Sequence, residues 1–259
     1  MEEVPLRQKA LGMTGAARTV LCLGDSLTYG QVGYSYLDFM KTPDRFINRG
    51  RNGDTVQGAA ARLTRYIASP RYAAVTTCIV GIGTNDTLWP TLARRSAFWA
   101  RYVAARAGAP VAGRDTDFRA AYERIVTQAR VAGWDLIVIG LPATELTWLP
   151  TETLAPRDAL IREIARTHAL PYVDQRAAMA AAALRFREAH PGASLRPYDW
   201  SGHNAARIGD ALAMSILPPS KDWFARRRQL ILSVDGVHHS SLAARAVAAA
   251  GAECLRERS

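Results

Sequence analysis

Short apolar runs alternate with helix-like segments along most of this chain, and this alternation constrains the fold more than any other feature. Five runs have the length and composition of buried strands: residues 19–24, 46–48, 74–82, 135–141 and 171–174. Between them, apolar residues recur at the spacing of an amphipathic helix, for example over residues 56–67 and 118–129. Strands that alternate with helices predict a parallel sheet with helices packed on both faces.

The predicted architecture is therefore an α/β fold, a three-layer α/β/α sandwich around a flavodoxin-like five-stranded parallel sheet. A chain of 259 residues suffices for one sizeable core, so we expect a single domain over residues 1–259. Two segments, about 87–114 and 185–230, break the alternation and carry Trp, Tyr and Arg residues. We interpret them as insertions that act as a lid or as walls for a substrate.

The chain carries a formal net charge of +10, which raises the question of nucleic acid, an anionic lipid surface or an acidic substrate as a partner. Thirty of its 33 basic residues are Arg, and they are spread through almost every segment. The one dense cluster is Arg226, Arg227 and Arg228. Dispersed arginine is typical of a solvated surface, so we expect no nucleic acid partner and no stable membrane insertion.

Signals for membranes, disulfides and metals are weak in this sequence. No run approaches the roughly 20 apolar residues that span a bilayer, and the start of the chain lacks the apolar core of a signal peptide. We expect a cytoplasmic protein, or a secreted or periplasmic one if a signal has been removed. Cys22, Cys78 and Cys254 are odd in number and far apart, which favours packing over disulfides. No metal-binding motif is present, so we expect no metal.

A lone hydroxyl group follows the first predicted strand, in the sequence GDS at residues 24–26. Ligands of a parallel sheet bind beyond the carboxyl ends of its strands, and Ser26 is placed there, beside the free N–H groups of a helix start. This position suits a nucleophile. The alternative is that Asp25 or Ser26 only caps the helix, and for an isolated GDS that interpretation is favoured.

A serine nucleophile needs a base to take its proton, and the base needs a partner that orients it. In LSVDGVHHS, Asp235 and His238 are three residues apart, so one turn can bring carboxylate and imidazole side by side. Together with Ser26 they would form a Ser-His-acid triad. Taken alone the pair is a weak signal, because many such pairs are surface turns.

Acyl transfer also needs hydrogen-bond donors for the oxyanion, each contributing about 3 kcal/mol. Gly53 follows the second predicted strand and lets a backbone N–H approach a ligand, whereas Asn85 follows the third and offers its side-chain amide. A turn glycine and a turn asparagine are the plainer interpretations. However, all four signals follow a strand or precede the last predicted helix, residues 242–255. A doubly wound sheet gathers its active-site loops at these places, so the joint placement argues against coincidence.

The chain resembles the SGNH hydrolases, also called the GDSL family of esterases and lipases. The matching segments occur in order: GDSL at 24–27, NRGRNGDT at 48–55, GTND at 83–86 and DGVH at 235–238. The resemblance implies that Ser26 is the nucleophile, that His238 is the general base and then the acid, and that Asp235 orients His238.

The resemblance also implies an oxyanion hole. Its donors would be the backbone N–H of the nucleophile Ser26, the backbone N–H of Gly53 and the side-chain amide of Asn85. Two neighbouring residues are alternatives for these roles. Gly50 lies in the same matching segment as Gly53, and His239 adjoins His238, the predicted base. The family spacing favours Gly53 and the first of the two histidines.

The implied activity is that of a serine esterase that hydrolyses carboxylic esters through an acyl-enzyme on Ser26, without a cofactor. We favour a small-molecule or carbohydrate ester with a short acyl chain or an O-acetyl group. Tyr198, Trp200 and Trp223 can form a stacking wall for a sugar, although ordinary packing is an equal alternative. Trp89 is a further candidate for substrate binding.

Other functions remain compatible with the same residues. A lysophospholipase or an acyl thioesterase of the same family is one alternative. A non-catalytic module that binds a glycan or a protein on the same fold is another, although it would not need the whole set of predicted catalytic residues. The oligomeric state is left open.

Overall fold

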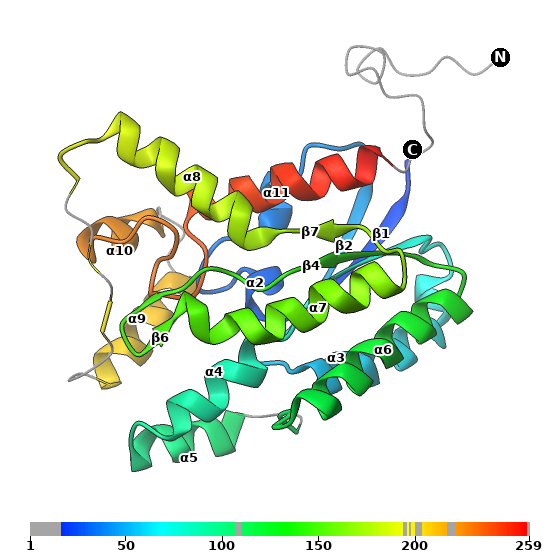
Figure 1. Ribbon diagram of the computed structural model, residues 1–259, viewed down its shortest axis with the longest axis horizontal. Helices are drawn as coiled ribbons and strands as arrows, with labels where there is room; N and C mark the ends of the chain where they lie inside the picture. The colour runs from blue at the N-terminus through cyan, green and yellow to red at the C-terminus, as the bar shows by residue number, and fades with distance from the viewer. Residues whose placement is uncertain are drawn as a thin grey trace.

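Helices enclose a single parallel sheet in the computed structural model of this protein, which describes residues 17–106, 110–193, 196, 198–199, 204–216 and 221–257 (Figure 1). The sheet has the strand order β2, β1, β3, β4, β7 and all its neighbouring strands pair in parallel. The strand bounds are β1 Thr19–Gly24, β2 Arg45–Gly50, β3 Thr77–Gly81, β4 Asp135–Ile139 and β7 Tyr172–Val173. The predicted three-layer sandwich with a five-stranded, flavodoxin-like sheet is confirmed.

The strand bounds differ from the predicted ones for every strand except β1. The strands β3, β4 and β7 are shorter than their predicted runs, residues 74–82, 135–141 and 171–174. The central strand β1 coincides with its apolar run, residues 19–24, because it is buried on both sides. The edge strand β2 is longer than the predicted 46–48, since Arg45 and Arg49 extend it without belonging to an apolar run. On an edge, solvent-facing residues need not be apolar, so composition understates the length of the strand.

Two groups of helices cover the two faces of the sheet (Figure 1). On one face lie α3 (Val56–Ile67), α6 (Asp115–Val131) and α7 (Ala155–Thr167), and on the other lie α8 (Gln175–Ala189) and α11 (Ser241–Arg256). Successive residues of β1 alternate between the two cores: Leu21 and Leu23 pack with the first group, whereas Val20 and Cys22 pack with the second. This is the period of two expected for a strand buried on both faces.

The carboxyl ends of three neighbouring strands are in register. Gly24 at the end of β1 pairs with Gly50 of β2 and with Gly81 of β3. The loops that follow these strands therefore start at one level and converge on one edge of the sheet.

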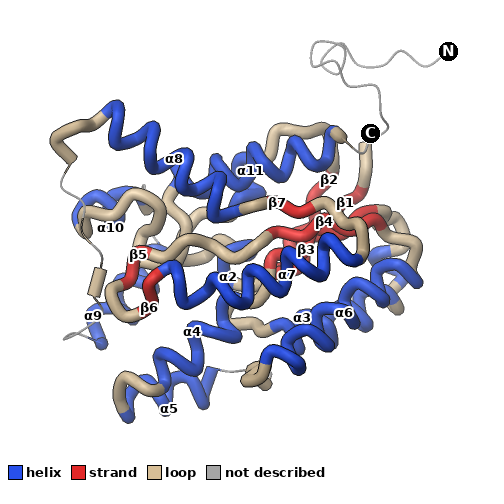
Figure 2. Tube along the Cα trace, viewed as in Figure 1, coloured by secondary structure: helices blue, strands red, loops and turns tan. Residues whose placement is uncertain are grey.

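Most of the remaining helices gather at this same edge (Figure 2). They are α2 (Ser26–Tyr29), α4 (Thr84–Ala93), α5 (Ala97–Arg106), α9 (Asn204–Ile216) and α10 (Asp222–Arg227). A two-stranded ribbon lies there too, formed by β5 (Glu145–Leu146) and β6 (Leu149–Pro150). Three short 3-10 turns complete the described elements: η1 (Tyr36–Phe39), η2 (Pro70–Tyr72) and η3 (Thr151–Leu154).

The two segments interpreted as insertions are largely helical in the part of the chain that the structure describes. The first, residues 87–114, contains the end of α4 and all of α5, and the second, residues 185–230, contains the end of α8 together with α9 and α10. Of the described helices, none combines the length and apolar character needed to cross a membrane.

Candidate active site

Ser26 stands at a sharp turn between β1 and the short helix α2. The strand ends at Gly24, and the side chain of Asp25 accepts a hydrogen bond from the backbone N–H of Leu27 at 2.9 Å, which starts the helix one residue later. Ser26 is thus the first helical residue, at the carboxyl edge of the sheet. Its hydroxyl group projects beyond the strands, and its backbone N–H has no partner within the helix.

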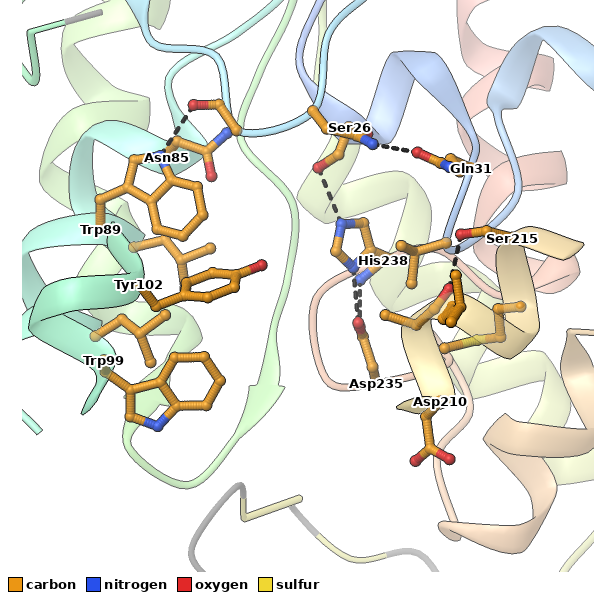
Figure 3. Close-up of a pocket in the computed structure, with 18 of the residues that line it drawn as sticks. Ser26, Gln31, Asn85, Trp89, Trp99, Tyr102, Asp210, Ser215, Asp235 and His238 are labelled. Atoms are coloured by element: carbon orange, nitrogen blue, oxygen red, sulfur yellow. Dashed lines mark hydrogen bonds and ion pairs between the residues drawn. The ribbon is translucent and has the colours of Figure 1, made fainter. Parts of the chain in front are cut away.

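His238 connects Ser26 to Asp235 (Figure 3). Its Nε2 lies 2.9 Å from the Ser26 Oγ, and its Nδ1 lies 2.7 Å from the Asp235 Oδ2. The other oxygen of Asp235 accepts the backbone N–H groups of Val237 and His238 at 3.0 and 2.8 Å, so the turn itself fixes the carboxylate. The structure therefore brings together three side chains from the two ends of the chain.

The charges in this chain of hydrogen bonds support one another. Burial by itself would raise the pKa of Asp235, but the adjoining His238 lowers the pKa of that carboxyl below its usual value. Burial likewise disfavours a charged imidazole, yet the Asp235 carboxylate raises the pKa of His238 above its usual value. The ionised carboxylate accepts a hydrogen bond from Nδ1–H, which fixes the proton on Nδ1 and leaves Nε2 to accept the proton of Ser26.

The neighbouring His239 faces away from Ser26. Its ring is buried, and its Nε2 lies 2.8 Å from the side-chain nitrogen of Gln175 on α8. Burial lowers the pKa of His239 to about 4, so this ring is neutral over the physiological pH range. Of the two adjacent histidines, only His238 contacts the serine.

The loop after β2 and the first turn of α4 hold the other two predicted residues. Gly53 has a backbone φ of 70°, a conformation that favours glycine. The Asn85 side-chain nitrogen donates to the backbone oxygen of Asp54 at 2.9 Å, and the Trp89 indole N–H donates to the backbone oxygen of Gly53, also at 2.9 Å. Asn85 and Trp89 are one helical turn apart, so α4 presents both to the same loop (Figure 3).

A buried ion pair anchors this loop to the end of β1. The Arg62 Nε donates to the Asp54 Oδ2 at 2.8 Å, and its Nη2 donates to the backbone oxygen of Gly24 at 2.9 Å. Both side chains are almost fully buried. Arg62 lies on α3 and gives no sequence signal of its own, because a single arginine in an amphipathic helix looks like a surface residue.

A cavity of about 380 Å³ opens beside Ser26 and His238. One wall comes from α4 and α5, and it consists of Leu88, Trp89, Leu92, Trp99 and Tyr102. The rings of this wall pack against each other, with the centroids of Trp99 and Tyr102 5.3 Å apart in an edge-to-face arrangement. The opposite wall comes from α9, with Ala211, Met214 and Ser215 among its residues. Figure 3 shows the triad residues between these two walls.

The structure places the four aromatic candidates for substrate binding differently from one another. Trp89 lines the cavity. Tyr198 does not line it, but its ring packs against Arg228, which does. Trp223 is 48% exposed on α10 and its ring stacks with Arg227, outside the residues that line the cavity. Trp200 lies outside the described residues.

Sequence reasoning missed most of the cavity wall. Trp99 and Tyr102 are three residues apart on α5, and this spacing identifies one face of a helix. The spacing does not reveal what that face contacts. Only the packing of α5 against α4 turns it toward Ser26.

The parallel sheet and the hydrogen-bonded Ser-His-Asp arrangement at its carboxyl edge define a serine hydrolase of the three-layer α/β class. The chain belongs to the GDSL-like lipase/acylhydrolase family, whose model matches residues 22–195. That match contains Ser26, Gly53 and Asn85 but ends before Asp235 and His238, which the DGVH segment predicts and the hydrogen bonds to Ser26 bring into the site.

Solved structures share the same fold. The lipase/acylhydrolase from Enterococcus faecalis is 18% identical, with a TM-score of 0.55 over 93% of this chain and 96% of that one. A GDSL-like lipase from Bacteroides thetaiotaomicron is 16% identical, with a TM-score of 0.53 over 98% and 96% of the two chains. A catalytic mutant of an acetylxylan esterase from Geobacillus stearothermophilus is 17% identical, with a TM-score of 0.56 over 93% and 95%. A comparison with curated protein sequences gave no match.

Proposed function

We propose that this protein is a serine esterase that hydrolyses carboxylic esters through an acyl-enzyme on Ser26. The observation that carries the proposal is the hydrogen-bonded chain from the Ser26 Oγ through His238 to Asp235, which opens onto a cavity of about 380 Å³. A merely structural serine has no need of a partly buried imidazole that a carboxylate orients toward it.

The reaction proceeds in two half-reactions. The Ser26 Oγ attacks the ester carbonyl carbon while the His238 Nε2 takes the hydroxyl proton, and Asp235 stabilises the imidazolium that forms. The imidazolium then gives this proton to the alkoxide oxygen of the departing alcohol, which leaves an acyl group on Ser26. A water molecule next attacks the carbonyl carbon of the acyl group and gives a proton to His238, which forms a second tetrahedral intermediate. When this intermediate collapses, His238 returns the proton to the Ser26 oxygen and the acid is released.

Three donors are available for the oxyanion that each half-reaction forms. The backbone N–H of Ser26 lies at the start of α2, the backbone N–H of Gly53 lies in the loop after β2, and the Asn85 amide lies in the first turn of α4. Asn85 donates one of its two N–H bonds to Asp54, and the second serves the oxyanion. Loss of one such donor typically lowers kcat by about 100- to 1,000-fold.

The substrate we favour is an ester with a short acyl chain or an O-acetyl group on a carbohydrate. The cavity supports this choice because one of its walls is aromatic and apolar, and such a surface can stack on the apolar face of a sugar ring. Its volume lies at the small end of the range for ligand pockets, about 300 to 1,000 Å³, which favours a compact acyl group over a long chain. A lysophospholipase or acyl thioesterase activity is the alternative within the family.

The nucleophile is tested with chromogenic esters and a Ser26→Ala variant. We expect wild type to hydrolyse acetyl esters and Ser26→Ala to lose this activity, while Ser69→Ala retains it. Ser69 is a suitable control because its side chain makes no capping hydrogen bond at the start of η2. Hydrolysis at the wild-type rate by Ser26→Ala would refute the proposal.

The substrate class is tested with a chain-length series, acetylated sugars and an acyl thioester. We expect kcat/KM to fall as the acyl chain lengthens and Trp99→Ala to raise the KM for an acetylated sugar by about 3- to 10-fold. Trp223→Ala is the comparison, and we expect a smaller effect because Trp223 lies outside the cavity wall. A preference for long acyl chains or for thioesters would favour the alternative.

A further inference from the structure

The side chain of Glu145, in the ribbon strand β5, binds one short segment of backbone. Its Oε1 accepts the N–H of Ile231 at 3.0 Å, and its Oε2 accepts the N–H groups of Leu232 and Ser233 at 3.1 and 2.8 Å. The Ser233 hydroxyl group donates to the same Oε2 at 2.5 Å. A single carboxylate thus accepts four hydrogen bonds from three consecutive residues, which end two residues before Asp235.

The contact continues into the turn that carries Asp235 and His238. The backbone N–H of Glu145 donates to the backbone oxygen of Gly236 at 2.8 Å, and the Ser233 Oγ accepts the N–H of Gly236 at 3.0 Å. Glu145 therefore holds this turn directly through its backbone and indirectly through Ser233. The turn is closed on its other side by a hydrogen bond from the N–H of Val234 to the backbone oxygen of His238 at 2.8 Å.

A carboxylate is the one side chain that fits this position. Three successive backbone N–H groups form a concave site with partial positive charge, and each hydrogen bond to an ionised acceptor is stronger than a neutral one. Glutamine has the same shape, but its NH₂ group would face backbone N–H donors at one of its two positions. The chemistry of the site therefore requires acceptors only.

We infer that Glu145 is a positioning residue, which fixes the turn carrying Asp235 and His238 so that the imidazole faces Ser26. This inference rests on the proposed function, in which His238 is the general base. Glu145 lies on β5 after β4, whereas the turn it holds follows α10 near the end of the chain. The turn follows the last sheet strand by more than 50 residues in the sequence, yet it lies at the carboxyl edge of the sheet. The contact with Glu145 explains how this irregular segment keeps a fixed position there.

The test compares Glu145→Gln with a matched variant at the far end of the sheet, Asp44→Asn. Asp44 is also a buried carboxylate, and it accepts the backbone N–H of Arg18 at 3.0 Å before β1. For Glu145→Gln we expect kcat to fall by about 10- to 100-fold with KM changed by no more than about twofold, because misplaced catalytic groups slow the chemical step. For Asp44→Asn we expect a loss of thermal stability with kcat and KM close to wild type.

The ionisation of His238 supplies a readout that does not depend on turnover. Since Asp235 raises the pKa of His238, a loosened turn should lower it, and the NMR titration of the His238 ring should shift to lower pH in Glu145→Gln but not in Asp44→Asn. Ser233→Ala removes the two hydrogen bonds of the Ser233 hydroxyl group, to Glu145 and from Gly236, but keeps the three backbone hydrogen bonds to Glu145. We therefore expect a smaller shift in the same direction. This second variant also serves if Glu145→Gln does not fold.

The outcomes separate the two proposals. A folded Glu145→Gln or Ser233→Ala with wild-type kcat and a wild-type His238 titration would overturn the positioning role and leave the esterase proposal intact. A wild-type protein without ester hydrolysis would instead refute the proposed function. In that case the NMR titration would still decide whether Glu145 fixes the turn.

Discussion

Trp89 donates its indole N–H to the backbone oxygen of Gly53 at 2.9 Å, so one side chain is both a wall of the cavity and a brace for the loop after β2. Asn85, one turn earlier on α4, holds the next residue of the same loop, Asp54. Hydrogen bonds from α4 therefore connect the cavity wall that would contact a substrate to the loop that carries a proposed oxyanion donor. Changes in the wall near Trp89 should alter kcat as well as KM.

The first prediction concerns Gly53→Ala. The backbone of Gly53 has a φ of 70°, and an added Cβ would lie 2.8 Å from the Cζ2 of Trp89. We expect the loop to move and kcat to fall by about 100-fold, as for the loss of an oxyanion donor. The measurement is kcat for an acetyl ester together with the melting temperature.

Gly133→Ala is the matched control for that experiment. Gly133 has nearly the same backbone conformation, with a φ of 72°, but nothing lies within 4 Å of an added Cβ. Its substitution should cost about 1 to 2 kcal/mol of stability through backbone strain and leave kcat unchanged. Equal losses of kcat in both variants would mean that the effect at Gly53 is general destabilisation.

The second prediction separates the two adjacent histidines. We expect His238→Ala to lower kcat by about 10,000-fold or more, since this ring contacts both Ser26 and Asp235. His239→Ala should lose stability, because it removes a buried ring and its contact with Gln175, but the folded fraction should retain most of the turnover. The measurement is kcat per folded protein, and comparable loss in both variants would contradict the assignment.

The third prediction is a pH dependence of activity. His238 must be neutral to accept the Ser26 proton, and its pKa is raised by Asp235 despite burial, which acts in the opposite direction. We therefore expect kcat/KM to rise with pH and to reach half its plateau above about 6.5, the ordinary value for histidine. A profile that stays flat from pH 5 to 8 would argue against histidine as the base.

The fourth prediction concerns stability and Asp25. Burial raises the pKa of Asp25 to about 7, whereas in the unfolded chain it is about 3.9. The folded state therefore binds the extra proton between these two values, and stability must fall as pH rises through this window. For the wild type this effect lowers the free energy of unfolding by about 3 kcal/mol between pH 5 and 8. We expect Asp25→Asn, which keeps the oxygen that accepts the Leu27 N–H, to lack this decrease.

Urea unfolding of wild type and Asp25→Asn at pH 5 and pH 8 measures this difference. Ionisable groups far from Asp25 contribute equally to both proteins, so the difference between the two pH dependences reports Asp25 together with the charges that it contacts. Identical pH dependences would mean that Asp25 is ionised in the folded protein at neutral pH.

Local patterns were sufficient for elements whose apolar residues form a continuous run or follow a regular helical spacing. The apolar run of β1 and the helical spacing of α3 and α6 carry their own signals, and the structure matches them closely. The edge strand β2 was predicted three residues too short, as 46–48, and the helices α5, α9 and α10 were predicted only as parts of two insertions. Their positions depend on neighbouring elements and not on their own sequence.

The sequence by itself determined the succession of strands and helices along the chain, the turn that presents Ser26 and the spacing of Asp235 and His238, because each depends on residues close together in the chain. Only the tertiary structure decided which aromatic rings line the cavity and which groups hold the site in place. Glu145, Arg62, Trp99 and Tyr102 act across long separations in sequence, and a contact between distant segments leaves no periodic or compositional pattern in either of them.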